Sequence, residues 1–100
     1  MPAPLGGATV AAPLDLAALR RQLMMTQAQF AALLGVHWIT VSKWERRLLT
    51  PSPWHLALIR AAATAVHRQP AVGQVIVAAL AERGVAFALY RMLAHALPAL

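Results

Sequence analysis

One hundred residues are enough for a single domain with a modest hydrophobic core. The chain contains no cysteine, which excludes disulfide bonds, cysteine-based zinc sites and thiol chemistry. Nine Lys and Arg stand against three Asp and Glu, and the resulting net charge of +6 favours a polyanionic partner, nucleic acid before an acidic membrane surface.

The composition also indicates the fold class. Sixty per cent of the residues are apolar, but many of these are alanine, a strong helix former, and β-branched runs bounded by turn residues are nearly absent. The sequence therefore predicts an all-α fold. The most apolar run, residues 71–81, is too short for a membrane span, which needs about twenty residues. We expect a soluble, cytoplasmic protein.

The chain begins with a segment unlike the rest. Residues 1–13 contain three prolines, two glycines and no charge, which is typical of a flexible arm and not of a signal peptide. A first helix is predicted from Asp15, which can stabilise the helix N-terminus, to about Met25. Its buried side comprises Leu16, Leu19 and Leu23, whereas Arg20 and Arg21 are expected to face outward.

Two short helices joined by a tight turn are predicted next. Thr26 and Gln29 have the spacing of a capping box, so a helix should begin at Gln27. Gly35 should end it, because glycine enters the left-handed conformation at little cost. The apolar side of this helix comprises Phe30, Leu33 and Leu34.

The second of these helices should run from about Trp38 to Arg46. Val41 and Trp44 are expected on its buried side, and the polar and basic residues on the other. Two helices around a glycine turn form a helix-turn-helix pattern, in which the second helix enters the major groove of DNA. The outward face would carry Trp38, Ile39, Thr40, Ser42, Lys43 and Arg46.

This stretch resembles the Cro/repressor-like (XRE-type) helix-turn-helix family of bacterial and phage regulators. The resemblance covers about residues 15–68 and implies a DNA-binding transcription regulator. The positions that match in register are Thr26, Gln27, Phe30, Ala31, Leu34, Gly35, Val36, Thr40, Val41, Ser42, Trp44, Glu45, Pro51 and Ser52. Two positions depart from the family pattern. His37 replaces the usual Ser or Thr cap of the second helix, and Arg47 replaces a glycine after it.

The resemblance and the spacing together suggest the DNA contacts. Lys43 can reach a guanine edge or a phosphate. Trp38 and Ile39 occupy positions where the family places base-reading residues, although Trp38 could instead fold back onto its own domain. The residues expected to bind phosphate, with a solvated side chain as the alternative for the two arginines, are Gln27, Thr40, Ser42, Arg46 and Arg47. Glu45 is expected to be structural and to pair with Arg20 or Arg21.

The rest of the chain should form three more helices. Ser52 and Pro53 mark the start of one that runs to about His67, and the residues expected to close the core are Trp54, Leu58 and Ala61 or Ala62. Another should span residues 71–83 and end at Gly84, and the last should span residues 85–96. These last two are more apolar than a DNA-binding domain requires, which favours a dimer interface or a protein partner at residues 71–97.

The domain organisation follows from these elements. Residues 1–13 would be the arm, residues 14–68 the DNA-binding domain, and residues 69–100 a C-terminal segment for dimerisation or partner binding. Seven of the nine Lys and Arg lie within residues 15–68, where phosphate binding would need them.

No catalytic or metal-binding pattern is found. The four histidines are scattered, and there is no glycine-rich phosphate loop, so we expect neither an enzyme nor a metal site nor a cofactor. The leading hypothesis is a homodimeric repressor of double-stranded DNA. One alternative is an antitoxin whose C-terminal helices bind a toxin, and another is an architectural protein that binds DNA without sequence preference.

Overall fold

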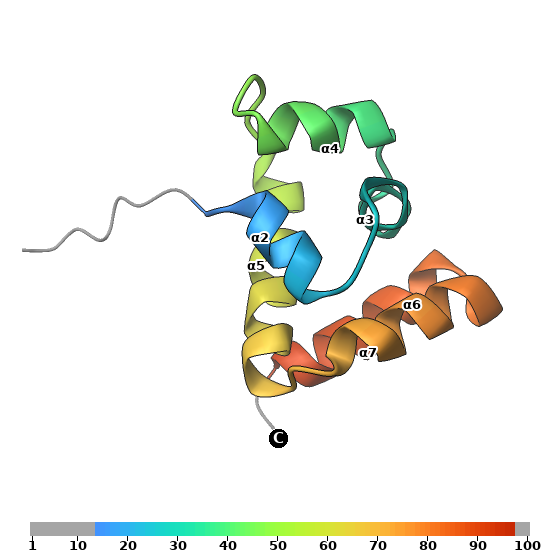
Figure 1. Cartoon of the computed structure of the whole chain (residues 1–100). Coiled ribbons are helices and arrows are strands. Elements are labelled where there is room, and N and C mark those ends of the chain that lie inside the picture. Colours follow the sequence, from blue (N-terminus) through green and yellow to red (C-terminus); the bar gives the residue numbers. More distant parts are fainter. Residues whose placement is uncertain (1–13, 98–100) are drawn as a thin grey trace, which may run out of the picture.

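The computed structural model describes residues 14–97, and the predicted arm, residues 1–13, lies outside them. The described part contains six helices and no strand, which confirms the all-α prediction. None of these helices is long and apolar enough to span a membrane. With the labels of Figure 1, the helices are α2 (Leu16–Gln22), α3 (Gln27–Leu34), α4 (Trp38–Glu45), α5 (Pro53–Arg68), α6 (Val72–Arg83) and α7 (Val85–Ala96).

The helices form two groups around α5. In Figure 1, α4 lies at one end of the molecule, and α6 and α7 lie together at the other. The α2 and α3 helices lie between these two ends. The α7 helix packs against α5, α6 and α3. The outer surface of α4 is therefore left free of the other helices.

The helix starts follow their predicted caps. The Asp15 carboxylate accepts a hydrogen bond from the Ala18 amide at 3.0 Å. Thr26 and Gln29 form the full capping box of α3. Ser52 caps α5, with Pro53 in its first turn. Short polar side chains of this kind satisfy amides that have no partner within the helix, so local sequence is sufficient to place these boundaries.

The α2 helix ends earlier than predicted. It stops at Gln22, not near Met25, because Met24 adopts a left-handed conformation with φ +57°. The amides of Met24 and Met25 then bond to the carbonyls of Arg21 and Arg20 at 2.9 and 3.1 Å, which is the Schellman arrangement. Methionine seldom takes this conformation, so the sequence carried no stop signal here.

One hydrophobic core contains residues of all six helices. Leu16 and Leu19 of α2 and Leu23 at its C-cap are buried as predicted, and so are Phe30, Leu33, Leu34, Val41 and Trp44 of α3 and α4. Much of the apolar character of the last two helices is used within the chain. Their contributions to this core are Val72, Ile76, Ala79, Ala88, Met92 and Ala96.

The prediction that Trp54 closes the core is wrong, since 67% of this residue is exposed. Trp54 lies one turn before the buried Leu58, so its spacing fits the core side of α5. The first turn of α5, however, extends past the edge of the core. His55 is the residue there that packs against Trp44, with ring centroids 5.4 Å apart.

A close backbone approach joins α6 to the end of α2. Gly73 is buried in the first turn of α6, and a Cβ atom placed on it would lie 2.1 Å from the carbonyl oxygen of Leu23. This separation is far shorter than any van der Waals contact, and the atom on the other side belongs to the backbone and cannot rotate away. Only glycine fits at this position without moving one of the two helices.

We therefore predict that Gly73→Ala destabilises the protein by at least about 2 kcal/mol, the cost of overpacking against a rigid neighbour. Urea unfolding followed by far-ultraviolet circular dichroism measures this cost. Gln74→Ala is the matched control, because Gln74 is exposed in the same turn. Equal stability of the two variants would contradict the close approach.

Candidate nucleic-acid interface

The turn between α3 and α4 sets the angle at which the two helices meet. Gly35 has φ +71°, and the Val36 amide bonds to the Ala31 carbonyl at 3.0 Å. Val36 then packs against the core. Because the turn is bonded to α3 on one side and anchored by Val36 on the other, α4 leaves it in a defined direction.

His37 caps the N-terminus of α4. Its Nδ1 atom accepts a hydrogen bond from the Ile39 amide at 3.1 Å, in place of the Ser or Thr hydroxyl typical of the family. The first departure from the family pattern is therefore accommodated by the histidine itself. Histidine is seldom a cap, so residue type alone gave no signal for this role.

The second departure from the family pattern is Arg47, which stands after α4 in place of a glycine. It keeps the left-handed conformation that glycine usually supplies, with φ +62°. The amides of Arg47 and Leu48 bond to the carbonyls of Trp44 and Lys43 at 3.1 and 2.9 Å. The α4 helix thus ends in a Schellman arrangement, which Arg47 adopts at a modest cost in backbone strain.

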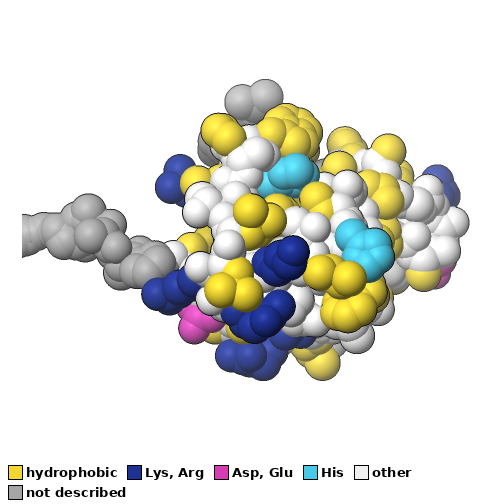
Figure 2. All heavy atoms as spheres, turned by 90° about the horizontal axis from the view of Figure 1, so that it is seen from above, with side chains coloured by type: hydrophobic (Ala, Val, Ile, Leu, Met, Phe, Trp, Pro, Cys, Tyr) yellow, Lys and Arg dark blue, Asp and Glu magenta, His cyan; other side chains and the backbone are white. Residues whose placement is uncertain are grey.

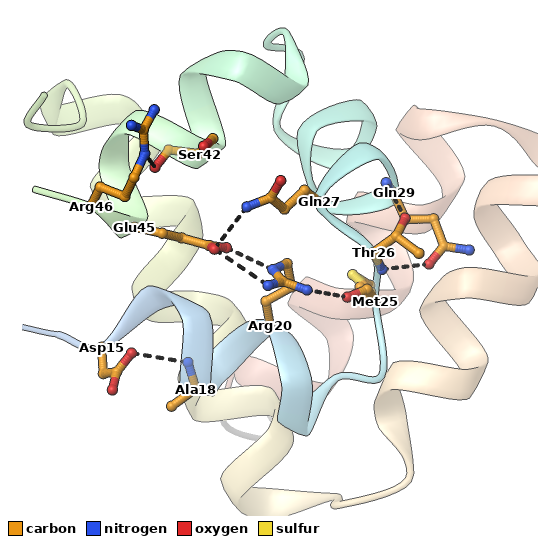
Figure 3. Close-up of polar contacts among 10 residues, drawn as sticks. All are labelled: Asp15, Ala18, Arg20, Met25, Thr26, Gln27, Gln29, Ser42, Glu45 and Arg46. Carbon is orange, nitrogen blue, oxygen red and sulfur yellow. Dashed lines mark hydrogen bonds and ion pairs between the residues drawn. The ribbon is translucent and has the colours of Figure 1, made fainter. Parts of the chain in front are cut away.

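Glu45 connects three helices, as Figure 3 shows. Its carboxylate accepts hydrogen bonds from Arg20 of α2 at 2.6 and 3.3 Å and from the amide nitrogen of Gln27 of α3 at 3.0 Å. Arg20 also donates to the Met25 carbonyl at 3.0 Å. The side chain of Glu45 is only 8% exposed. This cluster of Arg20, Gln27 and Glu45, here called the Glu45 cluster, holds α4 against α2 and α3.

The electrostatics of the Glu45 cluster favour the ionised carboxylate. Burial by itself would raise the pKa of Glu45, but the hydrogen bonds from Arg20 and Gln27 and the positive charges of Arg20 and Arg21 outweigh it. The net effect is a pKa below the ordinary value of a glutamate. The expected pairing of Glu45 with Arg20 is confirmed. The expectation that Arg20 faces outward is wrong, because the ion pair draws it inward, while Arg21 is exposed.

Gln27 lies at the N-terminus of α3, where the sequence placed a phosphate contact. Its side chain is half-buried, and one amide hydrogen is committed to Glu45. An amide nitrogen carries two hydrogens, so one donor remains for a phosphate. Glu45 thereby orients this amide before any ligand arrives.

The outward face of α4 brings most of the predicted contact residues together. Lys43, Arg46 and Arg47 are exposed. Thr40 and Ser42 are half-buried beside them, and Arg46 bonds back to the Ser42 carbonyl at 3.4 Å. Figure 2, which looks onto the α4 end of the molecule, shows Lys and Arg side chains interspersed with apolar ones. The surface therefore offers several cations to a polyanion from one side.

Two further apolar residues on this side, Leu48 and Leu49, were not singled out from the sequence. Leu48 and Leu49 follow Arg47 and are exposed. Leu49 lines a pocket of about 280 Å³ beside the end of α4, together with Leu14, Trp44 and Leu56. Two consecutive leucines directly after the end of the helix were the available signal.

Within residues 14–97 the structure brings together no group of three His, Asp or Glu side chains that could hold a metal ion. The Glu45 carboxylate is already bonded to three donor groups, which leaves it little freedom to act on a ligand.

Comparison with known proteins agrees with the geometry of α2 to α5. Residues 16–61 match the family model described as "Helix-turn-helix". No curated protein and no solved structure matches the chain. The matched range begins at the first residue of α2 and ends within α5, so it contains the whole Glu45 cluster.

We predict that Glu45→Gln lowers the free energy of unfolding by about 1.5–3 kcal/mol at pH 7, because the Arg20 guanidinium loses a charged acceptor. The pKa of Glu45 is depressed in the folded state, so the unfolded chain binds the proton first as the pH falls. The contribution should thus be full at pH 7 and be lost as the pH falls below 4.5, the ordinary glutamate pKa, and through the lower pKa of the folded state.

Urea unfolding at a series of pH values measures both effects. Glu82→Gln is the control, because Glu82 is exposed and makes no ion pair within the described part of the chain. Wild type and Glu45→Gln should converge in stability at low pH. A difference that persists unchanged at pH 3 would contradict the role of the carboxylate charge.

Proposed function

Since residues 16–61 belong to the Cro/repressor-like helix-turn-helix family of DNA-binding regulators, we propose that this protein is a sequence-specific repressor that binds double-stranded DNA in the cytoplasm as a homodimer. The observation that carries the proposal is the outward face of α4. It is fixed by the Glu45 cluster, and it exposes Lys43 with Arg46 and Arg47 at its end.

In this proposal α4 lies in the major groove and α3 crosses the phosphate backbone. Lys43 reads a base edge, since a lysine in the groove can donate to the O6 and N7 atoms of guanine. Arg46 and Arg47 lie at the end of α4, where a side chain meets the backbone of the groove wall. With Gln27, Thr40 and Ser42 they would bind phosphates and set the register of the helix.

The distribution of charge supports the same orientation. Residues 15–68 contain seven Lys and Arg against two acids, Asp15 and Glu45. Because the negative charge of Glu45 is neutralised by its ion pair with Arg20, it repels a phosphate only weakly. Binding should therefore weaken steeply with salt, by roughly one power of the salt concentration for each phosphate contacted.

The outer face of α7 supports the homodimer. Tyr90 and Leu97 are among the most exposed large apolar residues of the described chain, and Ala86 and Ala94 lie on the same face, with Leu89 and Leu93 half-buried at its edge. These residues recur at helical spacing with no charged side chain among them. The cation beside this face is Arg83, whose guanidinium lies over the Phe87 ring next to Tyr90, so two chains can meet on the face with that charge kept at its border.

Repression would then be steric. A symmetric dimer would place two α4 helices in successive major grooves about 34 Å apart, on an inverted repeat, and would exclude RNA polymerase from an overlapping promoter. The same α7 face could instead bind a different protein, as in an antitoxin. The oligomeric state of the purified protein distinguishes these two arrangements.

Selection of bound sites from random double-stranded DNA tests the proposal, followed by titration of the best site against a scrambled duplex. We expect an inverted repeat bound about a thousandfold or more tightly than the scrambled sequence. Uniform binding to all duplexes, lost as salt rises, would contradict sequence specificity and favour the architectural alternative.

Two alanine substitutions separate base reading from phosphate binding. Lys43→Ala should cost about 1–3 kcal/mol on the selected site and relax one base position. Arg47→Ala should weaken selected and scrambled duplexes by the same factor and reduce the salt dependence by about one phosphate. Competition titrations at several salt concentrations measure both. Equal losses from Lys43→Ala on every duplex would rule out base reading by this residue.

The dimer is tested on the exposed residues of α7. Tyr90→Glu combined with Leu97→Glu should leave the circular dichroism spectrum intact but convert the dimer to a monomer in sedimentation, because a buried unpaired charge is costly. Affinity for the inverted repeat should fall at least about tenfold. Ala81→Glu, on the exposed side of α6, is the matched control. A wild-type protein that is already monomeric would contradict the homodimer and favour a separate protein partner.

A further inference from the structure

The first turn of α4 presents two large apolar side chains to the solvent. Trp38 is 50% exposed and Ile39 is 43% exposed, although both begin a helix whose buried side is well filled. Val41 and Trp44 occupy that buried side. Because successive residues turn by about 100° around a helix, Ile39 lies opposite Val41 and Trp44, on the same stripe as Ser42, Lys43 and Arg46.

The conformation of this turn is held in place. The His37 cap fixes the amide of Ile39, and the His37 ring lies 5.8 Å from the Trp38 ring, centroid to centroid. Trp38 therefore packs beside the cap and lies outside the hydrophobic core, with half of its surface exposed. Two adjacent exposed apolar side chains on this face would gain solvation free energy from a partner that covers them.

The chemistry of these side chains restricts what they can recognise. Isoleucine has no hydrogen-bonding group, and the indole of tryptophan has one donor and no acceptor. Neither can form the bidentate pairs that distinguish guanine or adenine. In the major groove the one apolar group on a base edge is the 5-methyl group of thymine.

We propose that Trp38 and Ile39 form an apolar contact that selects thymine, through its 5-methyl group, at the bases facing the first turn of α4. This inference rests on the proposed function, and it names the base that the N-terminal half of the recognition helix reads. Lys43, one turn further along the same stripe, would read the neighbouring guanine or phosphate. Each half-site should therefore contain thymine next to the nucleotide that Lys43 contacts.

The size of the effect follows from the area of one methyl group. Burying a single methyl or methylene group changes an equilibrium constant about fourfold. Replacing thymine by uracil removes the methyl group and leaves every hydrogen-bonding atom of the base in place. The replacement thus measures the apolar contact separately from hydrogen bonding and from phosphate binding.

The experiment begins with site selection from random duplexes that contain thymine. The selected duplex is then synthesised with deoxyuridine in place of each thymine, one at a time, and titrated with the full-length protein. We expect about a threefold to fivefold loss of affinity at one or two positions in each half-site and no change at the others.

Variants assign the loss to its residues. Trp38→Ala and Ile39→Ala should each bind the thymine duplex more weakly and should lose the difference between thymine and uracil at one position. Lys43→Ala is the matched control, because it should weaken binding to both duplexes yet keep their ratio. Far-ultraviolet circular dichroism confirms that each variant is folded, and the comparison of duplexes with wild-type protein needs no variant.

Each result has a distinct meaning. A selected site whose affinity is unchanged by uracil at every position would overturn the thymine contact and leave the proposed repressor intact. A uracil effect that survives in both Trp38→Ala and Ile39→Ala would overturn its assignment to these residues. Failure to select any site would overturn the sequence-specific function together with the contact.

Discussion

The ion pair between Arg20 and Glu45 is the interaction on which the DNA-binding end of this molecule depends. It joins residues 25 positions apart in the sequence, and Gln27 of α3 donates a hydrogen bond to the same carboxylate. Hydrophobic packing of Val41 and Trp44 determines which side of α4 faces inward. It does not determine how far α4 slides or tilts, because apolar contacts are weakly directional. Three directed hydrogen bonds to one carboxylate remove that freedom, and they do so beside the face of α4 that we propose contacts the bases.

This arrangement also explains how an acidic residue, Glu45, can lie close to the basic surface of α4 without weakening its attraction for a polyanion. The carboxylate is turned toward two positive side chains and away from solvent, so the outward face keeps its full positive potential. The same logic explains why Gln27 is half-buried. A glutamine that contacts a phosphate gains from being oriented in advance, because less side-chain entropy is then lost on binding.

How much could be predicted from the sequence depended on the range of the interactions involved. Thr26 with Gln29, Gly35, and Ser52 with Pro53 act within one turn of their own backbone, and all three boundaries were predicted. Met24 and Arg47 adopt left-handed conformations against their residue type, because tertiary packing imposes the turn. Arg47 was identified only from the family pattern, and Met24 was missed. Trp54 has the correct helical spacing for the core but lies beyond its edge, a distinction that periodicity does not contain. The candidate contact residues on α4 followed from spacing and resemblance, whereas the His37 cap and the exposure of Leu48 and Leu49 required the structure.

Gly73 has a consequence for the distance between the two ends of the molecule. Where helices meet through long side chains, rotamer changes allow small sliding movements between them. Here α6 rests directly on the backbone at the end of α2, with nothing compressible between them. The α2 helix is bonded to α4 through Arg20, and α7 packs along α6, so the path from the outer face of α7 to the outer face of α4 runs through rigid contacts. These contacts fix the distance between the outer faces of α7 and α4. A dimer formed on α7 would therefore tolerate little variation in the number of base pairs that separate its two half-sites.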